Sequence, residues 1–354
     1  MKTFFETSGL RYCMIGSGSW ATALVKLLLN NQSYINWYLR SDENIEKIKE
    51  WHHNPNYLQS VYLDPERINM SSDINEVISN SDVLLFCTPS AYFMKVAESI
   101  NVSLQGKFII SAIKGFVGEK NQTVAEYFHD VHNIPFDRIG IVSGPCHAEE
   151  VAMERLSYLT LSSKHIEIAR ALCKVFECKY IKTNPGTDIY GVEYSAALKN
   201  IYAVAAGICH GLGYGDNFMA VLMTNSYHEL VSFINATHPD KSRIVSSSAY
   251  LGDLLVTGYS QFSRNRTFGN MVGKGYSVKS AMMEMNMVAE GYYACRCMSE
   301  INREYKLNMP IADAVYNILY ENKYPPFVIK QLTDLLFYIH TVCKNKSVDE
   351  DKRM

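Results

Sequence analysis

Short apolar runs alternate with helix-like stretches through the first half of the chain. Apolar side chains recur at the spacing of one helix face in residues 21–28 and again in residues 93–100. The runs between them are short, strand-like and apolar. The clearest predicted strands are residues 12–15, 34–39, 83–87, 108–112 and 139–142. This alternation predicts βαβ units that build a parallel sheet covered by helices.

The pattern changes after a last predicted strand–helix–strand unit, which comprises residues 157–162, 166–177 and 179–182. The sequence Asn-Pro-Gly-Thr at 184–187 then predicts a turn. From about residue 188 the strand-like runs give way to long helix-periodic stretches rich in Ala, Leu, Met, Asn and Tyr. We therefore expect an α/β domain over residues 1–187, an all-α C-terminal domain over residues 188–344, and a charged tail over residues 345–354.

Composition excludes several classes of protein. The chain has 354 residues, 47% of them apolar, and its 34 basic and 36 acidic residues give a formal net charge of −2. This size suits two globular domains, and so small a net charge gives no general attraction to nucleic acid or to an anionic membrane. No apolar run is long enough to span a membrane, and Glu6 and Arg11 interrupt the stretch that a signal peptide would need.

The cysteines indicate the compartment. There are nine of them, an odd number, mostly inside apolar segments, and none belongs to a CxxC pair. We interpret them as buried free thiols in a reducing cytoplasm. The ten histidines show no metal-ligand spacing, so no metal is expected.

A glycine-rich segment links the first predicted strand to the first predicted helix. Residues 16–21 have the sequence GSGSWA, which fits the GxGxx(G/A) fingerprint of dinucleotide-binding sites. Gly16 permits the tight turn, Gly18 lets the backbone approach a pyrophosphate, and the N-terminus of the helix attracts negative charge. The first domain is therefore expected to be an N-terminal Rossmann-like, doubly wound parallel sheet that binds NAD(P). The alternative is a bare strand-to-helix turn.

The second predicted strand ends in Arg40-Ser41-Asp42, where many NAD sites place an acid that holds the ribose hydroxyl. The Arg40 guanidinium can stack on adenine and pair with a 2′-phosphate, whereas Asp42 keeps NADH possible. The expected cofactor is thus NAD(H) or NADP(H), and a solvated Arg40 at the strand end is the alternative. A further polar run, FCTPS at 86–90, ends a strand at the same edge of the sheet.

Three more segments hold polar residues in apolar surroundings, namely SAIKG at 111–115, SGPCHAEE at 143–150 and EYSAALKN at 193–200. Lys114 follows a strand and is expected at the cofactor edge of the sheet, although a solvated lysine is an equal alternative. Lys199 precedes the apolar run IYAVAAGICHG, so it needs an anionic partner or a lowered pKa. A desolvated lysine beside a carbonyl can donate a proton as hydride arrives. The alternative is a lysine at the helix edge that reaches water.

Two later segments are candidates for holding an anionic substrate. Asp253 is a single acid in the apolar run LGDLLVT at 251–257, and SRNR follows at 263–266. The Ser263 hydroxyl, the Arg264 guanidinium and the Asn265 amide offer the directed hydrogen bonds that a phosphate ester needs. Each signal alone is weak, because Asp253 could equally cap a helix and SRNR could form a solvated turn.

Eight segments, taken in order, resemble motifs of the bacterial-type NAD(P)-dependent glycerol-3-phosphate dehydrogenases: GSGSWA, FCTPS, IKG, SGPCHAEE, EYSAALKN, GDLLVT, SRNRTFG and AEG. The resemblance extends from about residue 11 to about residue 320, and ordered motifs are far more specific than any one alone. It implies reversible NAD(P)H-dependent reduction of dihydroxyacetone phosphate to sn-glycerol 3-phosphate, a precursor of phospholipid backbones. The implied partner is therefore a small phosphorylated molecule.

The resemblance also implies roles for single residues. Lys199, in the ALKN motif, takes the place of the family's proton donor and acceptor, and Lys114 lies between cofactor and substrate. Arg264 and Asn265 are implied to lie nearest the substrate phosphate. The implied substrate-binding residues are Lys114, Gly144, Cys146, Lys199, Asp253, Ser263, Arg264 and Asn265. The implied cofactor-binding residues are Gly16, Gly18, Ser19, Trp20, Arg40, Lys114, Ala148, Arg264, Val288 and Glu290.

The sequence departs from the family pattern in two places. Ala21 stands where a third glycine is commoner, which the fingerprint allows. Cys146-His147 stands where the family commonly has a hydroxyl residue followed by an aromatic one. A cysteine nucleophile with a histidine base is one interpretation. A pocket-lining thiol is preferred, because adjacent residues on a turn rarely face each other and ketone reduction needs no covalent step.

Two other functions are compatible with parts of the sequence. A reductase of a β-hydroxyacid or another small keto acid would share the fold and a catalytic lysine. A non-catalytic NAD(P)H sensor would share GSGSWA but would have no reason to keep Lys199, Asp253 and Arg264 together. A homodimer is expected on base rate alone.

Overall fold

The computed structural model describes residues 4–6, 9–285 and 288–336. The chain divides into two compact units. The first runs to Ala197 and includes the later segment Asp240–Val256, and the second comprises Leu198–Pro239 and the residues from Thr257 onward. The charged tail expected at residues 345–354 lies outside the described residues. Within the described ranges, no helix is long and apolar enough to cross a membrane.

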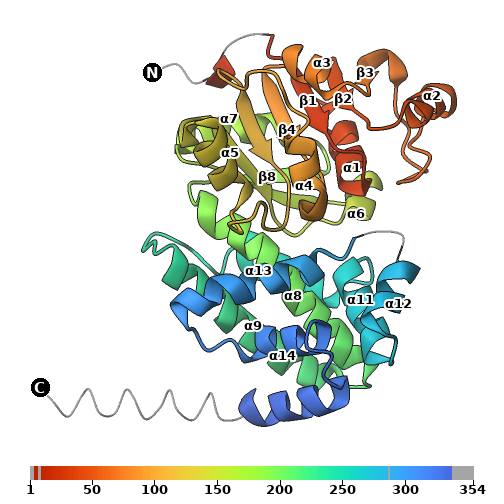
Figure 1. The fold of residues 1–354 in the computed structure, drawn as a ribbon. Coiled ribbons are helices and arrows are strands. Elements are labelled where there is room, and N and C mark those ends of the chain that lie inside the picture. The colour runs from red at the N-terminus through yellow and green to blue at the C-terminus, as the bar shows by residue number, and fades with distance from the viewer. Residues whose placement is uncertain (1–3, 7–8, 286–287, 337–354) are drawn as a thin grey trace, which may run out of the picture. The chain divides into compact units, whose positions relative to one another are not determined.

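The first unit, which carries the strand labels in Figure 1, is built on an eight-stranded sheet. Its strand order is β3-β2-β1-β4-β5-β6-β7-β8. All neighbouring strands are parallel except β6 and β7. The α/β class and the Rossmann-like sheet are thus confirmed, with the correction that the sheet is mostly and not wholly parallel. The strands are β1 (Tyr12–Ile15), β2 (Ile35–Tyr38), β3 (Ile68–Ser71), β4 (Val83–Phe86), β5 (Phe108–Ser111), β6 (Ile139–Ser143), β7 (Ser157–Ser163) and β8 (Ile181–Gly186).

Helices follow most strands and then make up the second unit. The first unit contains α1 (Ser19–Leu28), α2 (Asp42–Trp51), α3 (Ile74–Ser79), α4 (Ser90–Ala97), α5 (Val124–His132), α6 (Ala148–Ala152) and α7 (Ile166–Phe176). The chain then continues through α8 (Ile189–Gly211), α9 (Asp216–Thr237), the π-helix η4 (Ser248–Gly252), α10 (Asp253–Tyr259), α11 (Arg264–Gly273), α12 (Val278–Glu284), α13 (Glu290–Tyr305) and α14 (Pro310–Leu319). The expected helical second half is confirmed.

Both faces of the sheet are covered by helices, as two neighbouring side chains of β4 show. Leu85 belongs to the buried cluster that also contains side chains of α1 and α7. The ring of Phe86 instead packs on Phe93 of α4 and on Phe128 of α5. Because successive side chains of a strand point to opposite faces, two helix layers require strands that are apolar at every position. This is why the central strands are continuous apolar runs in the sequence.

The turn expected at residues 184–187 is wrong. β8 continues through Asn184, Pro185 and Gly186, which pair with three residues of β7. β8 is the edge strand of the sheet. A proline is tolerated there, because one side of an edge strand has no neighbour to which its backbone must donate.

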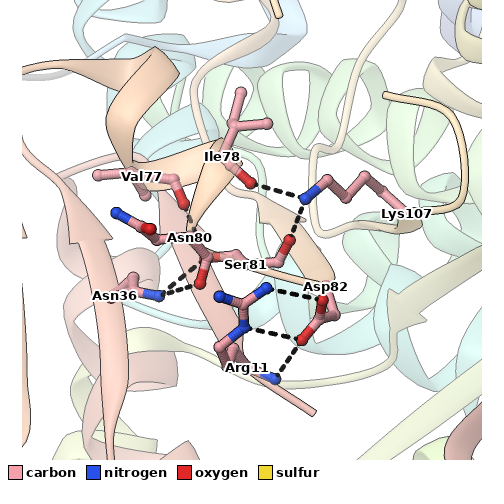
Figure 2. A network of polar contacts seen from close by, with 8 residues as sticks. All are labelled: Arg11, Asn36, Val77, Ile78, Asn80, Ser81, Asp82 and Lys107. Carbon is pink, nitrogen blue, oxygen red and sulfur yellow. Dashed lines mark hydrogen bonds and ion pairs between the residues drawn. The ribbon is translucent and has the colours of Figure 1, made fainter. Parts of the chain in front are cut away.

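Polar side chains tie together the amino ends of β1, β4 and β5 (Figure 2). Arg11, just before β1, donates from Nε and Nη2 to the carboxylate of Asp82, just before β4, at 3.1 and 3.0 Å. The hydrogen bond from Arg11 holds the pKa of Asp82 below its usual value. Lys107, just before β5, donates to the carbonyl oxygens of Ile78 and Ser81 at 3.0 and 2.5 Å. These contacts lie at the sheet edge opposite the glycine-rich loop.

Candidate active site

The carboxyl ends of four neighbouring parallel strands bring several candidate residues to one edge of the sheet. β1, β4, β5 and β6 lie side by side in that order. Gly16 follows β1, Thr88 follows β4 by two residues, Lys114 follows β5 by three residues, and Gly144 follows β6. Ligands of open α/β sheets bind outside this edge. The strand order thus gathers segments that are up to 128 residues apart, which is the difference between positions 16 and 144.

Gly16 and Gly18 of the loop are glycines for different structural reasons. Gly16 has a φ of 135°, and a Cβ built on it would overlap the carbonyl group of Cys87. The fold itself therefore excludes a side chain there. Gly18, the N-cap of α1, has extended backbone with a φ of −75°, and a Cβ built on it would meet no protein atom within 4 Å. Nothing within the described part of the protein requires a glycine at 18, whereas close approach of a diphosphate would.

Three side chains hold the loop in place by donating hydrogen bonds to its backbone carbonyl groups. Trp37 Nε1 donates to the Gly16 carbonyl at 2.7 Å, and Asn54 Nδ2 donates to the Ser17 carbonyl at 3.1 Å. Thr22 Oγ1 donates to the Gly18 carbonyl at 3.0 Å. The sequence pattern does not identify Trp37 or Asn54, because a buried indole on β2 and an asparagine in a loop carry no motif.

The start of α1 and its surroundings fit a dinucleotide. α1 begins without a side-chain cap, which leaves its N-terminal dipole suited to an anion. The Nε1 atom of Trp20 and the Oγ1 atom of Thr88 are both buried and have no hydrogen-bond partner among the described residues. Lys114 Nζ lies 5.6 Å from the centre of the Trp20 ring, which places a cation beside the loop. Arg40 is exposed beyond β2, and Ala148 is the first residue of α6.

The turn after β6 places a thiol in the same unit. Gly144 has a φ of 115°, and the Cys146 Sγ donates to the Tyr158 carbonyl of β7 at 3.2 Å. Cys146 is 7% exposed. A thiol that is buried and donates to a backbone carbonyl behaves as a packed side chain.

Asp253 belongs to the first unit although it follows two helices of the second. The segment Asp240–Val256 returns to the first unit and contains η4, which leads directly into Asp253 at the start of α10. A Cβ built on Gly252 would lie 3.7 Å from Pro145, so the end of η4 is beside the turn that carries Gly144. Asp253 is 1% exposed. Asp253 has helical backbone and continues η4 directly into α10, so it is not an N-cap, and its burial beside the turn suits a substrate contact.

The second unit gathers a different set of candidates around α8. Lys199 and Asn200 are 3% and 4% exposed. Asn265 of α11 donates from Nδ2 to the Asn200 Oδ1 at 2.8 Å and accepts from the Gly291 backbone N–H of α13 at 2.8 Å. Asn265 therefore links α8, α11 and α13, and it does so next to Glu290. No motif in the sequence indicates this role of Asn200.

The residues SRNR form a helix start and not a solvated turn. Ser263 caps α11 by accepting from the Arg266 backbone N–H at 3.3 Å, and Arg264 is the first residue of the helix. A serine, an arginine and a helix N-terminus together suit a phosphate group. Val288 lies between α12 and α13, beside residues 286–287, which are outside the described part of the chain.

A buried carboxyl group lies six residues before Lys199 on the same helix. Glu193 of α8 accepts from the Ala125 backbone N–H at the start of α5 at 3.3 Å. Burial raises the pKa of Glu193 to about 8. The EYSAALKN motif assigns Glu193 no function, and in the structure its hydrogen bond fixes the first turns of α8 to α5.

The fold and the loop together define a dinucleotide-binding protein with a helical second unit. Comparison with known proteins names the family. The N-terminal domain of the NAD-dependent glycerol-3-phosphate dehydrogenases matches residues 11–169, and their C-terminal domain matches residues 188–330. The chain belongs to this family, and it is an NAD(P)-dependent oxidoreductase.

Individual relatives agree with this assignment. The glycerol-3-phosphate dehydrogenase [NAD(P)+] of Latilactobacillus sakei is 37% identical over 314 residues, which cover 87% of this chain and 91% of the relative. The glycerol-3-phosphate dehydrogenase structure from Plasmodium falciparum superimposes with a TM-score of 0.79 at 26% identity, covering 92% of this chain and 96% of that one. The Coxiella burnetii enzyme has the same fold, with a TM-score of 0.83 at 24% identity over 92% of this chain and 98% of that one.

Proposed function

We propose that this chain catalyses the reversible NAD(P)H-dependent reduction of dihydroxyacetone phosphate to sn-glycerol 3-phosphate, with Lys199 as proton donor and acceptor. The observation that carries the proposal is the burial of Lys199 on α8, at 3% exposure, beside the Asn200–Asn265 hydrogen bond. An ammonium group kept from water can stabilise the negative charge that develops on a ketone oxygen and then transfer its proton. In the reverse direction the neutral amine takes the proton of the alcohol.

The cofactor supplies the hydride when it is bound, and the residues present fit it. Gly18 and the uncapped start of α1 would hold the pyrophosphate, and Gly16 sets the turn that aims the loop. The exposed guanidinium of Arg40 would contact the adenosine end. The remaining proposed cofactor contacts are Ser19, Trp20, Lys114, Ala148, Arg264, Val288 and Glu290.

The substrate would be held at its phosphate and at its reacting end. Ser263, Arg264 and Asn265, at the start of α11, would bind the phosphate with charge-assisted and directed hydrogen bonds. Lys114, Gly144, Cys146 and Asp253 would contact the rest of the molecule. Binding energy gained at the phosphate, away from the reacting carbon, can then be used to orient the ketone.

Three further points belong to the proposal. Residues 1–187 would act as the NAD(P)-binding domain and residues 188–344 as the helical substrate-binding and catalytic domain. The product would feed glycerophospholipid synthesis in a reducing cytoplasm, a proposal supported by the absence of disulfides among the described cysteines. A homodimer is proposed on base rate, and light scattering after size-exclusion chromatography measures it.

The first experiment follows oxidation of NADH and of NADPH by the purified protein with dihydroxyacetone phosphate, with unphosphorylated dihydroxyacetone as the control substrate. We expect turnover with the phosphorylated ketone alone. The cofactor that is oxidised faster shows whether the enzyme prefers NADH or NADPH, which the sequence at Arg40 leaves open. Turnover of a keto acid in place of the phosphorylated ketone would identify a different reductase. Cofactor binding without turnover of any ketone would indicate a sensor.

Two lysines that flank β5 provide a matched pair of variants. Lys114→Met removes a cation at the carboxyl end of the strand, and Lys107→Met removes one at the amino end, where it binds backbone carbonyls (Figure 2). We expect Lys114→Met to lower kcat/KM for dihydroxyacetone phosphate by about 10- to 100-fold, and Lys107→Met to leave it within about twofold. Equal losses in the two variants would show that Lys114 acts only through stability.

A further inference from the structure

A buried ion pair joins the start of α8 to the segment that carries Asp253. Asp188, directly before α8, accepts from Arg243 Nε at 2.5 Å and from Arg243 Nη2 at 3.2 Å. The side chains of Arg243 and Asp188 are 2% and 15% exposed. A guanidinium bound to both oxygens of a carboxylate fixes the direction of both groups as well as their separation. All of these residues belong to the first unit.

The same carboxylate has two more partners. Asp188 Oδ1 accepts from the Gly191 backbone N–H at 2.9 Å and so caps the first turn of α8. Its Oδ2 accepts from the hydroxyl group of Tyr250. Burial, followed by the charge of Asp188, raises the pKa of Tyr250, so the phenol keeps the proton that it donates. One carboxylate thus connects α8 with two points of the Asp240–Val256 segment.

The position of Tyr250 connects this cluster to the proposed substrate site. Tyr250 lies within η4, three residues before Asp253, and it is 4% exposed. π-Helical turns are uncommon and are often found at functional sites. Because η4 leads into α10 without a break, a displacement of Tyr250 moves the backbone that carries Asp253.

We propose that Asp188, Arg243 and Tyr250 form a positioning cluster that sets the direction of the Asp253 carboxylate toward the substrate. The proposal rests on the proposed function, because it assigns Asp253 to the substrate. None of the three residues touches substrate or cofactor in this scheme. They act by holding η4 against the capped start of α8, the helix that further along carries Lys199.

The test uses two variants of different severity. Tyr250→Phe removes one hydroxyl group, and Arg243→Met removes the charge but keeps a long apolar side chain. We expect KM for dihydroxyacetone phosphate to rise and kcat/KM to fall by about tenfold in Tyr250→Phe and by up to about 100-fold in Arg243→Met. The KM for NAD(P)H should stay within about twofold of wild type, because the cluster joins α8 to η4 and not to the glycine-rich loop.

Arg11→Met is the control, because Arg11 and Asp82 form a second bidentate ion pair in the first unit, at the amino ends of β1 and β4 (Figure 2). This control should leave the KM for the ketone within about twofold of wild type. If Arg243→Met also leaves it there while Asp253→Asn raises it, the positioning proposal is wrong and the proposed function stands. If the wild-type protein does not turn over the phosphorylated ketone, the proposed function fails and the positioning proposal with it.

A double-mutant cycle separates positioning from general stability. If Arg243 acts through Asp253, adding Arg243→Met to Asp253→Asn lowers kcat/KM much less than Arg243→Met does alone. Fully additive losses would show that Arg243 supports the fold and not the carboxylate, and would overturn the proposal. The same cycle can be measured with Tyr250→Phe, which removes only one hydroxyl group. This milder variant is used if the Arg243→Met protein does not fold.

Discussion

Replacing Gly18 by alanine should separate cofactor binding from folding, because the structure gives this glycine no role within the described part of the protein. Its φ of −75° is accessible to alanine, and the added methyl group would meet no protein atom within 4 Å. Such a substitution restricts the unfolded chain and stabilises a protein by about 0.4–1 kcal/mol. Glycine is preferred over alanine at an N-cap, which offsets this gain, so we expect the melting temperature of the cofactor-free protein to stay within about 2 °C of wild type.

Binding of NAD(P)H should weaken, although the fold is retained. A methyl group at 18 would stand where a diphosphate must approach the start of α1. Loss of one charge-assisted hydrogen bond there costs about 1.5–3 kcal/mol of binding free energy, which raises the dissociation constant by roughly 10- to 150-fold. Isothermal titration calorimetry with NADH and with NADPH measures this loss, and circular dichroism of the cofactor-free protein measures the melting temperature.

Gly16→Ala is the comparison, because its methyl group would overlap the Cys87 carbonyl and its φ is 135°. Strain of about 1–3 kcal/mol should lower the melting temperature by about 2–12 °C even without cofactor. The reasoning is refuted if Gly18→Ala binds the cofactor as tightly as wild type. It is also refuted if Gly18→Ala melts as early as Gly16→Ala, because the protein itself would then require the glycine.

Three other variants test single steps. Lys199→Met should lower kcat by at least about 100-fold and leave the dissociation constant for NADPH within about twofold, which stopped-flow kinetics and calorimetry measure; unchanged kcat would remove Lys199 from the chemistry. Asn54→Ala should raise the KM for NAD(P)H by about tenfold, because the Ser17 carbonyl loses its donor, while the KM for the ketone stays constant. Glu193→Gln tests pH dependence. Burial raises the pKa of Glu193 in the folded protein to about 8, whereas its ordinary value is about 4.5. Between these two pH values the wild-type protein must take up a proton to fold, so its free energy of unfolding falls as the pH rises through this range. Urea unfolding should therefore show Glu193→Gln gaining stability relative to wild type across that window, by at most about 1.4 kcal/mol per pH unit, and parallel curves would contradict the assignment.

Local patterns were sufficient for the central strands and for the glycine-rich loop. β1, β4 and β5 are buried at every position because helices cover both of their faces, and short apolar runs between helical stretches are typical of such strands. The apolar pattern did not predict β3, because only Ile68 of its four residues is buried. β8 was obscured by Pro185, because an edge strand tolerates a residue that predicts a turn elsewhere.

The candidate site shows the same division between local and tertiary information. The motifs that contain Lys114, Lys199 and Arg264 can be found from residue types and spacing. Asn54 and Trp37 cannot, because each acts through one hydrogen bond to the backbone of a loop that is distant in sequence. The pairing of Asn265 with Asn200 is likewise a product of how α8 and α11 pack.

The position of Asp253 is the point that depends most on tertiary contacts. Helical periodicity continues through the second half of the chain, so nothing in the pattern indicates that Asp240–Val256 returns to the sheet unit. Side-chain contacts hold this segment on the sheet unit, because Arg243 and Tyr250 both bind Asp188 beside β8. Asp253 belongs to the first unit and Ser263 to the second. If the cluster acts only on Asp253, then Arg243→Met should be non-additive with Asp253→Asn and additive with Ser263→Ala, and this contrast distinguishes local positioning from a general loss of structure.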